Sequence, residues 1–145
     1  MKEDHLLRIS GSMEADGQEP TDTIELMTRG SYMQKGGNWY ITYEESETTG
    51  YAGCTTTLKS AADGSRVAML RVGPAPSQLI IEKGTRHLCH YETGFGSMTL
   101  GVSADEIRHD LTAEGGTAEF SYVLDSGNEA FISRNAVRVT VSPVR

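Results

Sequence analysis

The chain has 145 residues, with 13 Lys and Arg against 20 Asp and Glu, so its formal net charge is −7. Hydrophobic residues make up 37% and charged residues 23%, which is too mixed for a disordered chain and too polar for a membrane span. The acidic balance argues against nucleic acid and anionic membranes as partners, because both need clustered positive charge. The length suits one domain, and we expect a single domain over residues 1–145.

The start of the chain and the cysteines indicate the compartment. Residues 1–5 are polar and acidic, with no apolar segment of signal-peptide length behind them. Cys54 and Cys89 lie far apart in sequence, which fits neither a redox motif nor a zinc site. We therefore expect a cytoplasmic protein with two reduced, partly buried cysteines and with no cofactor or metal.

Alternation of apolar and polar residues dominates the chain and predicts strands with one buried face. It is clearest at residues 39–44, 117–124 and 137–142. Further strand candidates lie at residues 6–13, 23–33, 55–61, 66–72, 78–82, 86–92 and 97–104. The near-regular spacing of about ten short segments indicates an all-β chain.

Short glycine-containing connections separate these segments, at residues 36–38, 63–65, 94–96, 115–116 and 126–128. Connections this short make neighbouring strands antiparallel. So many strands must close or stack to hide their edges, and an up-and-down order favours a closed barrel. The predicted fold is a single antiparallel up-and-down β-barrel of about 8–10 strands, whose interior has room for side chains and one small ligand.

One segment carries two competing signals. Ser103 and Glu106 have the spacing of a helix capping box, and Ile107 and Leu111 follow at helical spacing. The alternative is that the preceding strand continues through these residues. We favour the strand.

Several segments together resemble the YwiB-like family of uncharacterised bacterial proteins. The matching segments are residues 28–32 (TRGSY), 39–45 (WYITYEE), 53–58 (GCTTTL), 70–73 (LRVG) and 91–98 (YETGFGSM). They follow one order over most of the chain, with one departure at Gly94, where the family pattern often has proline. The resemblance implies a calycin-like, lipocalin-type β-barrel in which residues 98–109 form one long strand. It implies no activity and no catalytic residue.

Arg71 is the most informative charged residue, because it continues the apolar strand face of Val67 and Met69. We favour the interpretation that it ends the strand and reaches water. If it points inward instead, it needs a carboxylate or carbonyl partner, because an unpaired buried charge is costly. Glu45 shares a face with Tyr43 and is one such partner, although a solvated rim position is the better interpretation of Glu45.

The predicted inner faces also carry tyrosines that combine apolar bulk with a hydroxyl group. Tyr43, Tyr91 and Tyr122 are therefore candidate ligand-binding residues, together with Arg71 and Glu45. Packing alone would use these tyrosines in the same way. An inward Arg71 would bind the carboxylate of a ligand.

No motif identifies a catalytic or metal-binding residue. His87, Cys89 and Tyr91 share a strand face, but the spacing is common to any strand and no third ligand is identifiable. We therefore predict a non-enzymatic module that binds a small, partly apolar molecule in or at the mouth of the barrel, with an acidic ligand as one case. The alternatives are a module that pairs with itself or another protein through its surface or a strand edge, and a hydrolase that uses the rim carboxylates or His87.

Overall fold

The computed structural model describes residues 5–15, 23–47, 49, 51–92, 96–127 and 130–144. Within these residues all regular structure is β. The strands are β1 (His5–Ala15), β2 (Ile24–Lys35), β3 (Asn38–Glu44), β4 (Thr55–Ala61), β5 (Arg66–Val72), β6 (Ser77–Glu82), β7 (Arg86–Glu92), β8 (Ser97–Thr112), β9 (Gly115–Asp125) and β10 (Phe131–Pro143). The described part of the chain holds no helix of the length and apolarity that a membrane crossing requires. The predicted all-β class is confirmed.

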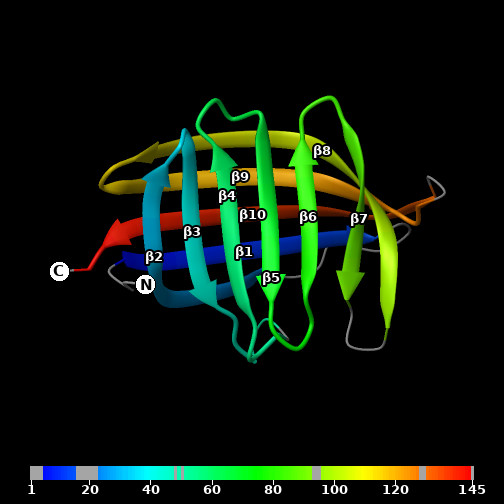
Figure 1. Ribbon diagram of the computed structural model, residues 1–145, viewed down its shortest axis with the longest axis horizontal. Coiled ribbons are helices and arrows are strands. Elements are labelled where there is room, and N and C mark those ends of the chain that lie inside the picture. The colour runs from blue at the N-terminus through cyan, green and yellow to red at the C-terminus, as the bar shows by residue number, and fades with distance from the viewer. Residues whose placement is uncertain are drawn as a thin grey trace.

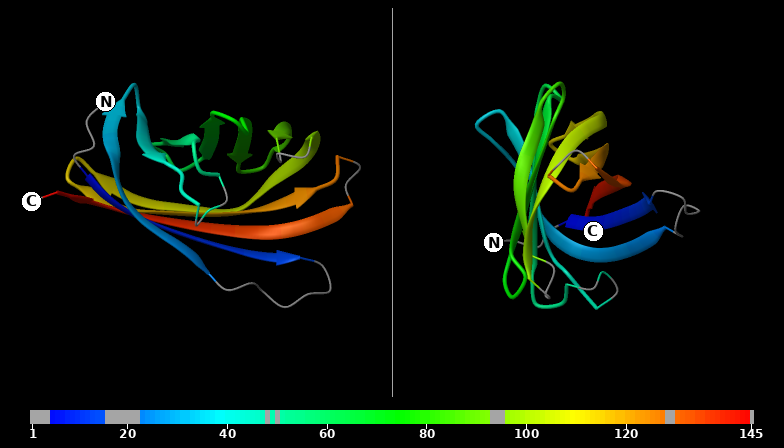
Figure 2. Two further views of the ribbon diagram at one scale, coloured as in Figure 1. Left: turned by 90° about the horizontal axis from the view of Figure 1, so that it is seen from below. Right: turned by 90° about the vertical axis from the view of Figure 1, so that its right-hand side faces the viewer.

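The strands close into one barrel in chain order, and β1 pairs with β10 to complete it. All neighbouring strands are antiparallel, which confirms the up-and-down barrel. The short strands β3–β7 stand upright at the front of Figure 1, and the long strands β1, β8, β9 and β10 cross behind them. Figure 2 shows these two layers from the side, so the barrel is flattened and its strands cross at a steep angle.

The two layers are joined by corner strands that pair with a different partner at each end. β2 pairs with β1 and then with β3, and its Gly30 lies opposite both His5 and Tyr43. β8 pairs with β7 and then with β9, and its Gly101 lies opposite both Leu88 and Asp125. A Cβ atom at Gly30 would overlap the Thr42 carbonyl oxygen, and one at Gly101 would overlap the Asp125 carboxylate. Glycine therefore allows the close backbone approach that turns each corner.

The inner faces of both layers form one apolar core. Its most deeply buried apolar side chains in the strands come from six of them: Leu7, Ile41, Val67, Ile81, Val102 and Val139. These residues alternate with outward-facing residues, as the period of two predicts, and some of the outward-facing residues are apolar, such as Leu6, Leu70 and Leu88. Cys54 and Cys89 are free and are more deeply buried than predicted, at 2% and 6% exposed.

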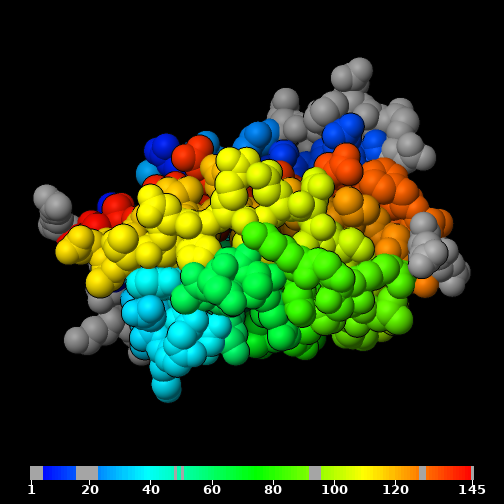
Figure 3. Space-filling view, turned by 90° about the horizontal axis from the view of Figure 1, so that it is seen from above, coloured from blue at the N-terminus to red at the C-terminus, as the bar shows by residue number. Residues whose placement is uncertain are grey.

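The upper end of the barrel in Figure 1 is covered by contact between the layers. The Tyr32 hydroxyl donates a hydrogen bond of 2.6 Å to the Thr112 carbonyl at the end of β8. Gly64, in the β4–β5 turn, lies against the ring of His109, which also belongs to β8. Figure 3 shows β8 in yellow against the green turns from above. The described residues of the connections 45–54 and 73–76 lie at the lower end.

Three predictions about the strands need correction or completion. Residues 103–111 belong to β8, which bears out the favoured strand and excludes the helix; the strand reaches Thr112 through a bulge at 104–106. The β8–β9 turn lies at residues 113–114, and Gly115 and Gly116 begin β9 instead of forming the turn. The predicted hairpin at residues 94–96 and the turn at 126–128 fall partly on 93–95 and 128–129, which lie outside the described residues.

Candidate functional site: an arginine among tyrosines

Arg71 lies on the inner face of the barrel and is only 9% exposed. The prediction that it reaches water is therefore wrong. Its Nε atom donates a hydrogen bond of 2.7 Å to the Ala75 carbonyl oxygen, because the connection after β5 turns back beneath the strand end. Its Cζ atom lies 3.5 Å from the centre of the Tyr51 ring and 5.2 Å from that of Tyr91. The Ala75 carbonyl and the two aromatic rings stabilise the buried guanidinium of Arg71, which the strand pattern alone predicted to be in contact with water.

The strand register places Arg71 in a row of inward-facing residues at the lower end of the barrel. Across β3 to β7, each of the following residues lies directly opposite the next: Tyr43, Thr56, Arg71, Ser77 and Tyr91. Directly opposed residues share one face of a sheet, so these side chains point into the same region. The register therefore brings together three residues that the sequence analysis selected.

Tyr51 completes this group and was not among the predicted residues. It comes from the connection between β3 and β4, where no period marks an inward position. Its hydroxyl lies 2.7 Å from the hydroxyl of Tyr91 in a shared hydrogen bond, and its ring covers the guanidinium of Arg71. The base of the connection is fixed by backbone hydrogen bonds from Glu45 to Cys54 and from Cys54 to Tyr51. An aromatic residue inside an otherwise polar connection is the one signal that could have identified it.

Tyr122 extends the group from the opposite layer of the barrel. It lies on β9 and is buried, and the charges of Tyr91, Tyr51 and Arg71 all influence its ionisation. Burial raises the pKa of Tyr122 far above its ordinary value, and Arg71 opposes that rise only weakly. Burial likewise raises the pKa of Tyr51, and its hydrogen bond to Tyr91 raises it further. The hydroxyls of Tyr51 and Tyr122 are therefore neutral donors and acceptors throughout the physiological range of pH.

Glu45 lies just beyond the end of β3 and interacts with Tyr43. Burial raises the pKa of Tyr43 strongly, and the neighbouring carboxylate of Glu45 raises it further. This half-buried position agrees with the predicted place at the rim. A direct pair between Glu45 and Arg71 stays a prediction. We call Arg71, Tyr43, Tyr51, Tyr91 and Tyr122 the tyrosine–arginine cluster, with Glu45 at its rim.

The residues that the sequence offered for catalysis or metal binding, His87, Cys89 and Glu45, have other partners. His87 lies on the inner face of β7 with its Nε2 atom 3.0 Å from a carboxylate oxygen of Glu82, and Cys89 accepts a hydrogen bond from the Ile80 amide. His87 is thus paired with Glu82, and Glu45 with Tyr43 at the lower rim. Within the described residues, no group of three His, Cys, Asp or Glu side chains is arranged to hold a metal ion. The cluster offers anion recognition, with one guanidinium and several phenol hydroxyls.

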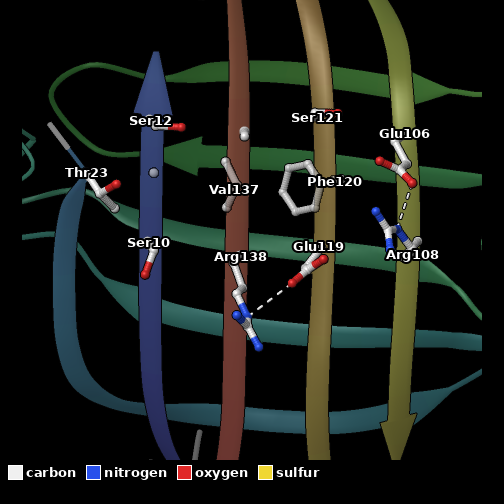
Figure 4. Close-up of a pocket in the computed structure, with 12 residues that line it drawn as sticks. Ser10, Ser12, Thr23, Glu106, Arg108, Glu119, Phe120, Ser121, Val137 and Arg138 are labelled. Atoms are coloured by element: carbon white, nitrogen blue, oxygen red, sulfur yellow. Dashed lines mark ion pairs between the residues drawn. The ribbon is translucent and has the colours of Figure 1, made fainter. Parts of the chain in front are cut away.

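A hollow of about 300 Å³ on the outer wall has a different character. Figure 4 shows it across β1, β10, β9 and β8. Its arginines are neutralised by their neighbours on the same wall: Arg138 lies 3.2 Å from Glu119, and Arg108 lies 2.7 Å from Glu106. All four side chains are well exposed to solvent, where such pairs bind a further anion only weakly. The buried cation of the cluster is the stronger candidate for a site.

The comparisons with known proteins bear on the family and the fold. Residues 7–139 match the family described as "Domain of unknown function (DUF1934)". The chain belongs to this family. Its structure is similar to the crystal structure of the ywiB protein from Bacillus subtilis, with a TM-score of 0.81 and 24% sequence identity over 100% of this chain and 96% of that one. This likeness confirms the family resemblance stated from the sequence. At 24% identity it shows the same barrel fold and nothing about function. No curated protein matches the chain.

Proposed function

We propose that this DUF1934 barrel is a non-enzymatic binding module that holds a small, partly apolar anion at its lower end. The observation that carries the proposal is the buried Arg71, whose guanidinium lies on the inner face over the ring of Tyr51, and the Tyr51 hydroxyl shares a hydrogen bond with that of Tyr91. A guanidinium next to phenol hydroxyls matches a carboxylate in both charge and hydrogen-bonding geometry. Arg71 shares its strand face with Val67 and Met69, apolar side chains of the kind that contact an aliphatic or aromatic tail. The free cysteines fit a reducing compartment, so we place this binding in the cytoplasm.

The proposal predicts that carboxylates bind and that Arg71 decides their affinity. Titration calorimetry with octanoate and benzoate, against octanol and benzyl alcohol, tests both statements. We expect the acids to bind at least about tenfold more tightly than the alcohols, since a charge-assisted hydrogen bond contributes about 1.5–3 kcal/mol. Arg71→Met is expected to remove that preference, and Tyr51→Phe to reduce it while keeping the ring that covers the guanidinium.

The matched control is Arg138→Met, which removes an exposed arginine of the outer wall. It is expected to leave the affinities unchanged. Thermal unfolding of each variant shows that a lost affinity is not a lost fold. Equal affinities for acids and alcohols, or acid binding that survives Arg71→Met in a folded protein, would count against the proposal.

A second candidate function is pairing of the barrel with another copy of itself. Exposed apolar side chains on the outer faces of β1 and β2, with Met27 66% exposed beside Leu6, favour it. Light scattering on a size-exclusion column is expected to show a dimer that Met27→Glu dissociates. A monomer at millimolar concentration would remove this candidate.

A further inference from the structure

The contact between β6 and β7 differs from the other contacts in the barrel wall. The register between these strands consists of one pair, Ser77 with Tyr91. By contrast, β5 and β6 share six such pairs, and β7 and β8 share seven. At the upper end, Glu82 and Thr85 form an isolated bridge at the turn. We call the interval between this turn and the Ser77–Tyr91 pair the β6–β7 seam.

The contacts within the seam are weak for a barrel wall. The Ile80 amide donates to the Sγ atom of Cys89 at 3.4 Å, and a thiol is a poorer acceptor than a backbone carbonyl. Near the top of the seam, His87 and Glu82 make a side-chain contact of 3.0 Å, with both side chains partly open to solvent. Local opening costs least where the fewest backbone hydrogen bonds are broken. The seam is therefore the interval of the barrel wall with the fewest regular strand pairs among the described strands.

We propose that the native barrel opens locally along the β6–β7 seam and that this opening admits small molecules to the tyrosine–arginine cluster. Tyr91, at the lower end of the seam, belongs to the cluster and hydrogen bonds with Tyr51. Separation of β6 from β7 thus exposes the inner face beside Arg71 without unfolding the other strands. The role in ligand entry rests on the proposed function, whereas the opening itself does not.

Cys89 reports on this opening, because it lies on the inner face within the seam and is only 6% exposed. The experiment measures native-state labelling by an aromatic disulfide reagent in a Cys54→Ala variant, which keeps Cys89 alone. The matched control carries Cys54→Ala, Cys89→Ala and Ser60→Cys. Position 60 is 3% exposed and lies in β4, paired on both sides with β3 and β5. Each rate is divided by that of the same thiol in the denatured chain.

We expect Cys89 to be labelled at least about tenfold faster than the thiol at position 60, which should react only through global unfolding. Glu82→Ala should increase the Cys89 rate several-fold and leave the rate at position 60 unchanged after correction for any change in global stability. Equal rates at the two positions would overturn the proposal. Because no ligand takes part, this outcome is independent of whether carboxylates bind.

Discussion

Replacing Asp125 by alanine is expected to lower the free energy of unfolding by about 3 kcal/mol, at the lower end of what breaking a buried ion pair costs. Asp125 is 7% exposed and accepts two hydrogen bonds from Arg86, at 2.8 and 2.7 Å, and one from the Gly127 amide at 2.9 Å. Because the side chain of Arg86 is about one third exposed, water can partly solvate it once Asp125 is removed, and the loss of unfolding free energy stays at the lower end of that range. Urea denaturation measures it.

The physical reason is that this ion pair fixes the β8 corner. Asp125 ends β9 directly opposite Gly101, and the carboxylate and guanidinium occupy the space that a Cβ atom at Gly101 would need. Gly101→Ala is therefore expected to destabilise the barrel as well. The control is Glu119→Ala, which removes an exposed partner of Arg138 and should cost less than about 1 kcal/mol. Equal losses for Asp125→Ala and Glu119→Ala would contradict this account.

Above pH 10 the barrel is expected to lose stability steeply and to unfold. Burial raises the pKa of Tyr32 to about 12 and raises the pKa values of Tyr43, Tyr51 and Tyr122. In the unfolded chain these phenols ionise near pH 10, whereas in the folded barrel they keep their protons. The folded state then binds more protons, so a rise in pH favours unfolding. Each such tyrosine lowers the free energy of unfolding by about 1.4 kcal/mol per pH unit above 10.

The measurement follows tyrosinate absorbance at 295 nm and circular dichroism together over pH 9–12.5. These tyrosines should ionise in one cooperative step that coincides with loss of the β signal. Below pH 10 they leave stability unchanged, because they are protonated in both states. Gradual ionisation near pH 10 with an intact barrel would show that the hydroxyls are not protected by burial.

The strand alternation was sufficient to predict the barrel, and its failures occur where polar side chains face inward. The prediction for β10 began at residue 137, whereas the strand begins at Phe131. In the missed part, Asn135 and Ser133 lie on the inner side and hydrogen bond to each other at 3.0 Å, so the apolar period is lost. Pairing with β1 and β9 defines this strand, and neither contact is visible in a local pattern.

Four of the five cluster residues were predictable from the sequence, whereas Tyr51 and the geometry of the site were not. Alternation placed Arg71, Tyr43, Tyr91 and Tyr122 on the apolar faces of their strands. For Arg71, at a strand end, it could not decide whether the side chain reaches water or stays inside the barrel. The partners that decide this, the Ala75 carbonyl and the Tyr51 ring, come from two connections that meet only in the folded chain. Local sequence gives strand faces, whereas loops that converge on one end of a barrel depend on the complete strand register.

Native mass spectrometry of the protein purified from its own organism shows whether the tyrosine–arginine cluster holds an anion. We expect a fraction of the protein to carry an additional small anionic molecule, and we expect this mass to be absent from Arg71→Met and retained in Arg138→Met. A protein of bare mass under these conditions, or a bound molecule that persists in a folded Arg71→Met variant, would contradict the assignment of the tyrosine–arginine cluster as an anion site.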